Sequence, residues 1–256
     1  MRGTTHAGDE ARLVHDALQD GIETIVVAGG DGTWSKCAVP IARAGSPARM
    51  ALLSAGTGND FAENLRISAR DPLRLARLLA EGATERRVDL GRVDDTWFLN
   101  VAGFGFDVAV LRRSQGWRRV RGPAVYLIAA LQELVGFPGL DLEVDGTPGR
   151  RLMAVFSNGA RFGGAFQIAP DARVDDGLID SILVDDAAAL TRLRILLRVL
   201  RGTHRAHPRV THRREARYLL RFTEPPTFEA DGELCRAAAK EVEVATVAGA
   251  LRVVDA

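Results

Sequence analysis

Acidic and hydroxyl side chains stand among glycines in a short stretch near the N-terminus, residues 29–33, which read GGDGT. The exposed backbone N–H groups of such a turn make a nest for anions, and a helix that follows adds its positive dipole. Asp31 would be repelled by phosphate unless it holds Mg²⁺ or takes a proton from a nucleophile. The stretch therefore indicates phosphate chemistry, and a plain glycine turn capped by Asp31 is the alternative.

This turn differs from two common phosphate-binding sequences. The dinucleotide fingerprint has glycines spaced G-x-G-x-x-G, and the Walker A loop ends in G-K-[ST], neither of which occurs here. Lysine is nearly absent, because the chain contains only Lys36 and Lys240. The charge of a bound phosphate must therefore be met by arginine, by backbone N–H groups or by a metal ion.

A second glycine turn, residues 55–62 (AGTGNDFA), lies a short distance along the chain. Each turn follows a short apolar stretch, residues 25–27 and 49–54, that is typical of a buried strand. Helices are expected at 7–18, at 33–44 and after the second turn, and strands that alternate with helices indicate a parallel sheet. Both turns would then lie at the carboxyl ends of strands, where open α/β sheets bind ligands.

Two acidic stretches follow in the second half of the chain. Residues 169–180 (APDARVDDGLID) hold four carboxylates, and spaced acids on a loop that contains glycine suit a hard cation such as Mg²⁺ or Ca²⁺. The alternative is a solvated turn. Residues 228–233 (FEADGE) read as a hairpin turn when taken alone, but near a hydroxyl nucleophile they could supply a general base with a supporting carboxylate.

The pattern changes after Gly82, where short strands and turns replace the alternation of strands and helices. We expect a mostly antiparallel β region with inserted helices, including a hairpin around Asp145-Gly146. Residues 104–111 are ambiguous. We place the domain boundary near Glu85, which gives an α/β domain of residues 1–85 and a β-rich domain of residues 86–256.

Composition excludes several classes of protein. The net charge of the 256 residues is +1, so no basic field for nucleic acid is present. Cys37 and Cys235 are too few for a disulfide framework and favour a reducing compartment. No secretory signal and no apolar run long enough to cross a membrane is visible. We therefore expect a cytoplasmic protein.

Taken together, these four stretches resemble the signatures of the diacylglycerol kinase catalytic-domain family, which includes bacterial lipid kinases, sphingosine kinases and ceramide kinases. GGDGT is similar to its nucleotide-loop signature and AGTGNDFA to its second signature. APDARVDDGLID is similar to a segment that holds a structural Mg²⁺ in bacterial members, and Asp231-Gly232-Glu233 to a late acidic motif. The resemblance implies a Rossmann-like α/β nucleotide domain and an antiparallel β-sandwich lipid domain, with the active site between them and the last segment returning to the first domain.

The resemblance also implies roles for individual residues. Glycine-turn residues would bind ATP phosphates, namely Gly29, Gly30, Asp31, Gly32, Thr33, Gly56, Thr57, Gly58 and Asn59. Asp231 would take the proton of the lipid hydroxyl, with Glu233 in support, and Asp31 would orient nucleotide-bound Mg²⁺ or the acceptor hydroxyl. Which of Asp31 and Asp231 is the base stays open. Asp176 is the expected ligand of the structural metal.

The resemblance implies an enzyme of lipid metabolism that transfers the γ-phosphate of ATP, with Mg²⁺, to a lipid hydroxyl. Diacylglycerol or a related lipid, in a phospholipid pathway, is the expected acceptor. One departure is that family members usually begin with a further strand and an Asn-Pro turn before the glycine motif, whereas this sequence starts too late for them. A truncated, non-catalytic nucleotide- or lipid-binding member of the family is therefore the alternative.

A lipid acceptor requires access to a bilayer. Residues 190–201 predict an amphipathic helix whose leucines share one arc and whose arginines share the next: Leu190, Leu193, Leu196, Leu197 and Leu200, and Arg194, Arg198 and Arg201. Such a helix can lie on an anionic lipid surface or can pack its leucines on the core. Trp117 among several arginines is a second candidate surface. We expect peripheral membrane binding and leave a homodimer open.

Overall fold

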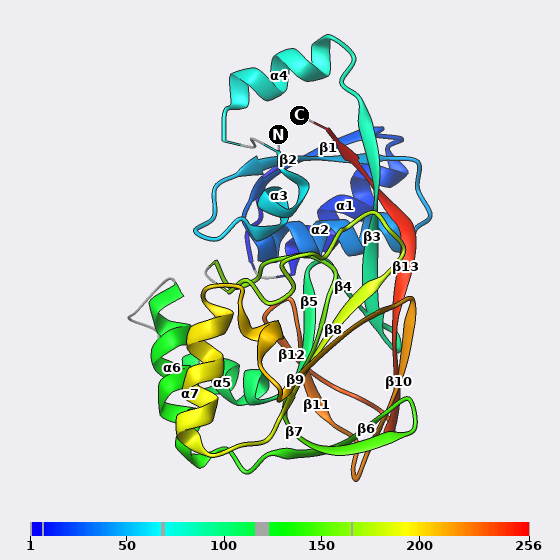
Figure 1. Cartoon of the computed structure of the whole chain (residues 1–256). Coiled ribbons are helices and arrows are strands. Elements are labelled where there is room, and N and C mark those ends of the chain that lie inside the picture. The colour runs from blue at the N-terminus through cyan, green and yellow to red at the C-terminus, as the bar shows by residue number, and fades with distance from the viewer. Residues whose placement is uncertain (1, 7, 68–69, 116–122, 165, 256) are drawn as a thin grey trace.

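The computed structural model describes residues 2–6, 8–67, 70–115, 123–164 and 166–255 (Figure 1). Its helices are α1 (Asp9–Gln19), α2 (Asp31–Arg43), α3 (Asp60–Leu65), α4 (Pro72–Ala80), α5 (Phe106–Gln115), α6 (Pro123–Gly136), α7 (Ala189–Val199) and the 3-10 helix η1 (His204–Ala206). Its strands are β1 (Thr24–Gly29), β2 (Arg49–Ser54), β3 (Glu85–Val93), β4 (Thr96–Phe98), β5 (Val101–Gly105), β6 (Leu140–Val144), β7 (Thr147–Ser157), β8 (Ile179–Asp185), β9 (Val210–Glu215), β10 (Arg217–Phe222), β11 (Thr227–Ala230), β12 (Glu233–Arg236) and β13 (Glu241–Val254).

The N-terminal part is built on the parallel pair β1 and β2, whose registers run from Thr24 opposite Arg49 to Gly29 opposite Ser54. Helix α2 packs against this pair through Trp34, which is fully buried and whose indole Nε1 donates a hydrogen bond to the Val27 carbonyl at 3.2 Å. The expected parallel sheet, with a glycine turn at the carboxyl end of each strand, is confirmed.

The C-terminal part is antiparallel. Strands β10, β6, β7, β5, β11 and β12 follow one another in the sheet, and β8 joins β7 to β9. They curl around a core of aromatic side chains in which the Phe104 ring lies 5.5 Å from Phe228 and the Phe156 ring 5.2 Å from Tyr218. Helices α5, α6 and α7 lie together beside this sheet (Figure 1), and a second apolar core fills the space between them and the strands.

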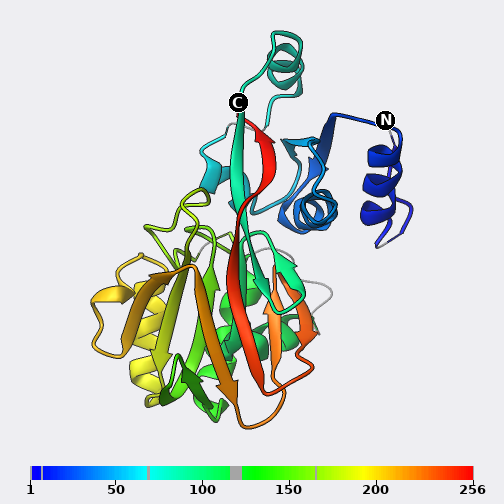
Figure 2. The same ribbon diagram turned by 90° about the vertical axis from the view of Figure 1, so that its right-hand side faces the viewer.

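Strand β13 joins the two parts. It pairs antiparallel with β10 and β3 and, near its end, parallel with β2, where Arg252 lies opposite Arg49 and Val253 opposite Met50. Figure 2 shows β13 running beside β3 from the lower β-rich part to the upper α/β part. The last segment therefore returns to the N-terminal sheet. The division at Glu85 stays a prediction.

Two-residue hairpins occur at two Asp-Gly pairs. Asp145 and Gly146 have φ of 48° and 78°, and Asp231 and Gly232 have φ of 47° and 83°. Positive φ at both central residues is the type I′ geometry that Asp-Gly favours, so the hairpin expected at Asp145-Gly146 is confirmed. The ambiguous residues 104–111 divide between the end of β5 and the start of α5.

The amphipathic helix expected at 190–201 forms as α7. Leu193, Leu196 and Leu200 pack on the second apolar core, whereas Leu190 and Leu197 are exposed. The patch expected around Trp117 lies outside the described residues. Within the described residues, no helix has the length and apolar character that crossing a membrane requires.

Candidate active site

The two glycine turns touch through their backbones. A Cβ on Gly56 would lie 2.5 Å from the Cα of Gly30, and a Cβ on Gly30 would lie 2.9 Å from the Cα of Gly56. Real side chains do not fit such spaces, so glycine is needed at both positions for the turns to meet. The backbone of one turn is thereby placed against the backbone of the other, as expected from their positions at neighbouring strand ends.

Side chains from both turns lock this contact. The Asn59 side chain accepts a hydrogen bond from Gly56 N at 3.2 Å and donates one to the Gly56 carbonyl at 2.8 Å, which holds the second turn closed. Asp31 crosses to the second turn, where its Oδ1 accepts from Phe61 N at 2.9 Å. Asp31 thus satisfies one of the free N–H groups at the start of α3.

The N-terminus of α2 is open to an anion. The helix begins at Asp31, and its N-cap Gly30 supplies no side chain to the first-turn N–H groups. A Cβ on Gly32 would meet nothing within 4 Å, so the space in front of this turn is free. First-turn N–H groups carry the positive end of the helix dipole, and a phosphate fits such a site.

Asp231 lies at the tip of the hairpin between β11 and β12. Its Oδ2 accepts from Leu99 N at 2.5 Å and from the Ser35 hydroxyl at 2.6 Å. Its Oδ1 accepts from Asn100 N at 2.8 Å and from Val101 N at 3.1 Å. The hydroxyl of Ser35 comes from α2, so this carboxylate ties the tip to the helix that begins at the first glycine turn.

The surroundings of Asp231 act on its pKa in opposite directions. Burial raises the pKa of the Asp231 carboxyl, and the hydrogen bonds from Leu99 N, Ser35 and Asn100 N lower it. The net direction is upward. A carboxylate with a raised pKa is a stronger base, which suits proton abstraction from a hydroxyl.

Two other acids of the predicted site lie in different surroundings. Glu233 is 64% exposed and forms an ion pair with Lys36 at 3.0 Å. Asp176 pairs with Arg214 and accepts from Leu178 N at 3.1 Å. A metal ion at Asp176 would have to displace the Arg214 guanidinium, and the described residues contain no cluster of three acidic, histidine or cysteine side chains suited to a metal.

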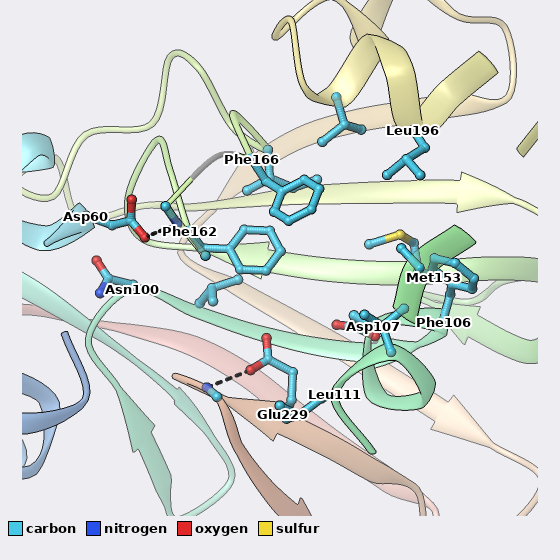
Figure 3. Close-up of a pocket in the computed structure, with 18 of the residues that line it drawn as sticks. Asp60, Asn100, Phe106, Asp107, Leu111, Met153, Phe162, Phe166, Leu196 and Glu229 are labelled. Carbon is cyan, nitrogen blue, oxygen red and sulfur yellow. Dashed lines mark hydrogen bonds between the residues drawn. The ribbon is translucent and has the colours of Figure 1, made fainter. Parts of the chain in front are cut away.

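A cavity of about 430 Å³ opens at the glycine turns and runs into the β-rich part. Asp31, Gly32, Thr57, Gly58 and Asp231 of the predicted site line it. Further in, its walls are apolar side chains of the sheet, of α5 and α7 and of the segment between β7 and β8, among them Leu111, Met153, Phe162, Phe166 and Leu196 (Figure 3). Leu134 of α6 lines it as well. The cavity therefore has an entrance that can bind phosphate and an apolar interior.

Three acids that line this cavity were not predicted as site residues. Asp60, in the second glycine turn, accepts a hydrogen bond from Gly164 N at 2.8 Å. Asp107 lies in the first turn of α5, and Glu229 comes from β11, two residues before Asp231. Asp107 Oδ2 and Glu229 Oε1 are buried and have no hydrogen-bond partner among the described residues. Glu229 could have been noticed within the FEADGE stretch. Asp107 could not, because nothing in its local sequence distinguishes it from an ordinary helix-start acid.

The fold combines an α/β part built on a parallel sheet with a curled antiparallel β part. Two family models match the chain. Residues 1–93 match the diacylglycerol kinase catalytic domain, and residues 100–255 match the YegS C-terminal NAD kinase beta sandwich-like domain. The chain therefore belongs to the diacylglycerol kinase family, and the predictions of this family, of the fold class and of a kinase are confirmed.

Relatives and solved structures agree with this assignment. The chain is 33% identical to a probable lipid kinase YegS-like of Xanthomonas euvesicatoria, over 91% of this chain and 79% of the relative. It is 33% identical to a diacylglycerol kinase of Mycobacterium tuberculosis, over 77% of this chain and 66% of the relative. The crystal structure of a diacylglycerol kinase from Bacillus anthracis has the same fold, with a TM-score of 0.73 at 17% identity, over 98% of this chain and 82% of that one.

Proposed function

We propose that this protein transfers the γ-phosphate of ATP, with Mg²⁺, to the hydroxyl of a membrane lipid, with diacylglycerol or a related lipid as the acceptor. The observation that carries the proposal is the position of Asp231, which lies where the glycine-turn mouth meets the apolar cavity. A lipid tail in the cavity would bring its polar end to this carboxylate.

The glycine turns would hold the nucleotide. Gly29, Gly30, Gly32 and Thr33 would place backbone N–H groups around the phosphates, while Gly56, Thr57, Gly58 and Asn59 would form the opposite side of the pocket. Bound ATP supplies the phosphoryl group and Mg²⁺ neutralises its charge. Asp31, whose second oxygen faces the space beside Gly58, would orient the metal or the acceptor hydroxyl.

Asp231 would act as the general base. The acceptor hydroxyl gives its proton to Asp231 as its oxygen forms a bond to the γ-phosphorus, and the bond to the bridging oxygen of the leaving ADP breaks. Ser35 and the N–H groups of residues 99–101 would fix the carboxylate for this transfer. Glu233 would support it indirectly, through its ion pair with Lys36 on α2.

The lipid acceptor also requires a membrane-facing surface. Helix α6 exposes Ile128, Leu131 and Val135, the last with 79% of its surface accessible, and α7 exposes Leu190 and Leu197. Exposed arginines add positive charge to this part of the chain, namely Arg194 and Arg198 of α7 and Arg201 just after it. Both helices also line the cavity, so a cytoplasmic protein that docks through this surface would receive its lipid directly.

The test is transfer of radiolabelled γ-phosphate from ATP to lipids in mixed micelles. The panel holds diacylglycerol, monoacylglycerol, ceramide, sphingosine and phosphatidylglycerol, and the variants are Asp31→Asn and Asp231→Asn. We expect Mg²⁺-dependent labelling that both variants lose. If no lipid is labelled by a chain that binds ATP, the proposal fails and the non-catalytic alternative takes its place.

A second measurement tests the membrane surface. Leu131→Glu and Val135→Glu place charge on exposed positions and are expected to weaken co-sedimentation with anionic vesicles several-fold. Arg221→Glu, on the exposed face of β10, is the control. Equal losses in all three variants would remove the argument for docking through α6. A homodimer stays a prediction that light scattering would test.

A further inference from the structure

We propose that Asn100 is a further catalytic residue, whose side-chain amide donates a hydrogen bond to the phosphoryl group during its transfer, and that Asn64 is the positioning residue that sets the direction of this amide. The inference rests on the proposed lipid kinase function and adds two residues to its site. Neither residue was predicted from the sequence. Asn64 lies in α3, and Asn100 directly precedes β5.

The orientation of the Asn100 amide follows from a short chain of hydrogen bonds. Ala160 N donates to Asn64 Oδ1 at 3.1 Å. Because a backbone N–H can only donate, this bond fixes which end of the Asn64 amide is the oxygen. The Nδ2 of Asn64 then donates to Asn100 Oδ1 at 3.3 Å. The Nδ2 of Asn100 is therefore the end of its amide that faces away from Asn64.

The free end of this amide belongs to a nearly buried side chain. Asn100 is 5% exposed and lines the cavity. Its Nδ2 donates to none of the described residues, yet it is not among the unpartnered side-chain atoms that are shut off from solvent. A donor this deep in a protein is costly while it stays unpaired, so its access to the cavity points to an acceptor that arrives with the ligand.

The free donor lies beside the proposed general base. The backbone of the same residue binds that base, because Asn100 N donates to Asp231 Oδ1 at 2.8 Å. Figure 3 shows Asn100 next to Asp60, at the opposite end of the view from Met153 and Leu196. The amide thus lies where the acceptor hydroxyl would meet the γ-phosphoryl group, and away from the surface that a lipid tail would contact.

The charges around the cavity favour a neutral donor. Aspartates of the glycine turns and of the hairpin tip line it, namely Asp31, Asp60 and Asp231. Arg192 is the cation among the described lining residues, and its guanidinium already donates to the Leu134 carbonyl at 2.8 Å and to Asp186 at 2.6 Å. The negative charge of the phosphoryl oxygens must therefore be met by Mg²⁺ and by neutral donors. Asn100 supplies such a donor beside the base.

Asn64 joins the two parts of the molecule at this point. It belongs to the α/β part, whereas its partners Asn100 and Ala160 belong to the β-rich part. A Cβ on Gly159 would lie 2.0 Å from Asn64 Nδ2, so the bare backbone of Gly159 makes room for this side chain. The direction of the Asn100 amide is thus set from the helix that follows the second glycine turn.

Asn100 exchanges no proton in the reaction. The acceptor hydroxyl gives its proton to Asp231, its oxygen bonds to the γ-phosphorus, and ADP leaves with the bridging oxygen. The amide keeps both of its protons and donates a hydrogen bond to one of the phosphoryl oxygens over which the charge is spread. A donor that is oriented in advance stabilises this state without reorganisation.

The first experiment measures lipid phosphorylation by Asn100→Ala, which removes the amide and keeps the backbone N–H that binds Asp231. We expect kcat to fall about a hundredfold, while KM for ATP and for the lipid changes less than about threefold, because the bond is made only during transfer. Gln19→Ala, which removes an exposed amide from α1, is the control and should keep the wild-type kcat. A wild-type kcat in Asn100→Ala would overturn the proposal.

A double-mutant cycle tests the positioning role of Asn64. Asn64→Asp keeps an acceptor for Ala160 N and removes the donor to Asn100, whose amide is then expected to turn its oxygen toward the cavity. The change should lower kcat about tenfold or more in the otherwise wild-type protein, and less than about twofold when combined with Asn100→Ala. Gln19→Glu makes the same chemical change at an exposed side chain. Equal losses in both backgrounds would show that Asn64 does not act through Asn100.

Binding of a phosphoryl mimic separates this proposal from the kinase function. ADP with Mg²⁺ and aluminium fluoride imitates the group in transfer and needs no lipid. It should raise the melting temperature of the wild-type protein further than ADP with Mg²⁺ does, and Asn100→Ala should lose this extra rise. If the extra rise is seen and lost although no lipid is phosphorylated, the kinase function fails and the Asn100 contact stands. If the extra rise is equal in the two proteins while lipid is phosphorylated, the kinase function stands and the Asn100 contact fails.

Discussion

The two Asp-Gly hairpin tips of the molecule have nearly the same backbone and entirely different surroundings. Asp145 and Asp231 have φ of 48° and 47°, and the glycine after each has φ of 78° and 83°. Asp145 accepts from Leu219 N at 2.9 Å and pairs with Arg213 at 3.0 Å near the surface. Asp231 accepts four hydrogen bonds beside the cavity and has no cationic partner among the described residues.

The Asp-Gly sequence therefore specifies the turn, whereas the residues packed around the turn determine the chemistry of its aspartate. Arg213 neutralises the Asp145 carboxylate, so this ion pair has a structural role. Asp231 is half-buried and is held by neutral donors, so no cation among the described residues neutralises its charge. Parallel substitutions at the two tips test this difference.

The largest difference is expected when each aspartate becomes asparagine. Asp231→Asn should lower kcat for lipid phosphorylation by about a thousandfold, because asparagine cannot take the hydroxyl proton. Asp145→Asn should leave kcat within about twofold, since exposed ion pairs contribute little. Steady-state transfer of labelled γ-phosphate measures both. Equal activities of the two variants would remove Asp231 from the mechanism.

The glycine that follows each aspartate should separate stability from activity. A Cβ on Gly146 or Gly232 meets nothing within 4 Å, so the effect of alanine comes from the positive φ alone. Both alanine variants should lose about 1 kcal/mol of unfolding free energy, a shift of about 3 °C in Tm. Gly232→Ala alone should also lower kcat, by about tenfold, because it moves the tip that carries Asp231. Calorimetry and the transfer assay together test this, and a larger loss of activity in Gly146→Ala would contradict it.

The pH dependence of activity should report the surroundings of Asp231. Burial raises the pKa of the Asp231 carboxyl, so kcat/KM should rise with pH through a value above that of an ordinary aspartate. Ser35 donates to the charged form and lowers this pKa, so Ser35→Ala should move the rising limb to higher pH. The ratio of the two pH profiles cancels the titration of ATP. A limb that moves to lower pH would show that Ser35 does not stabilise the carboxylate.

The smallest effect is expected in the stability contributed by the ion pair at the other tip. Asp145→Asn should lower the unfolding free energy by less than about 1 kcal/mol, and added salt should shrink the loss because the pair is partly exposed. Urea unfolding at low and high ionic strength measures this. A loss that does not change with salt would show that the ion pair with Arg213 is not its cause.

The mouth of the cavity could be predicted from sequence because it is built from backbone. Gly30 and Gly56 are required where the two turns touch, and a short motif records such a requirement directly. The same holds for the type I′ tips, which Asp-Gly encodes locally. These features depend on residues that are neighbours in sequence.

The interior of the cavity could not be predicted, because its members come from distant segments. Asp107 and Glu229 meet only after β5 and β11 pair, and neither residue type nor spacing announces a buried carboxyl. The role expected for Asp176 depends likewise on a distant partner, since Arg214 reaches it from β9. The support of Asp231 by Ser35 joins positions 196 residues apart. Such contacts follow from tertiary pairing and leave no local pattern.

Strand β13 gives the molecule an unusual order of assembly. Its last residues pair with β2, so Arg252 and Val253 extend the parallel pair of β1 and β2, which is made within the first 54 residues. Closing a contact across this span of chain requires a large loss of conformational entropy, which makes it a late and slow event in folding. While the chain is being synthesised, one edge of β2 stays unpaired until β13, far along the chain, has been made. Until then, this open edge of β2 would be the place where the growing chain depends most on protection against aggregation.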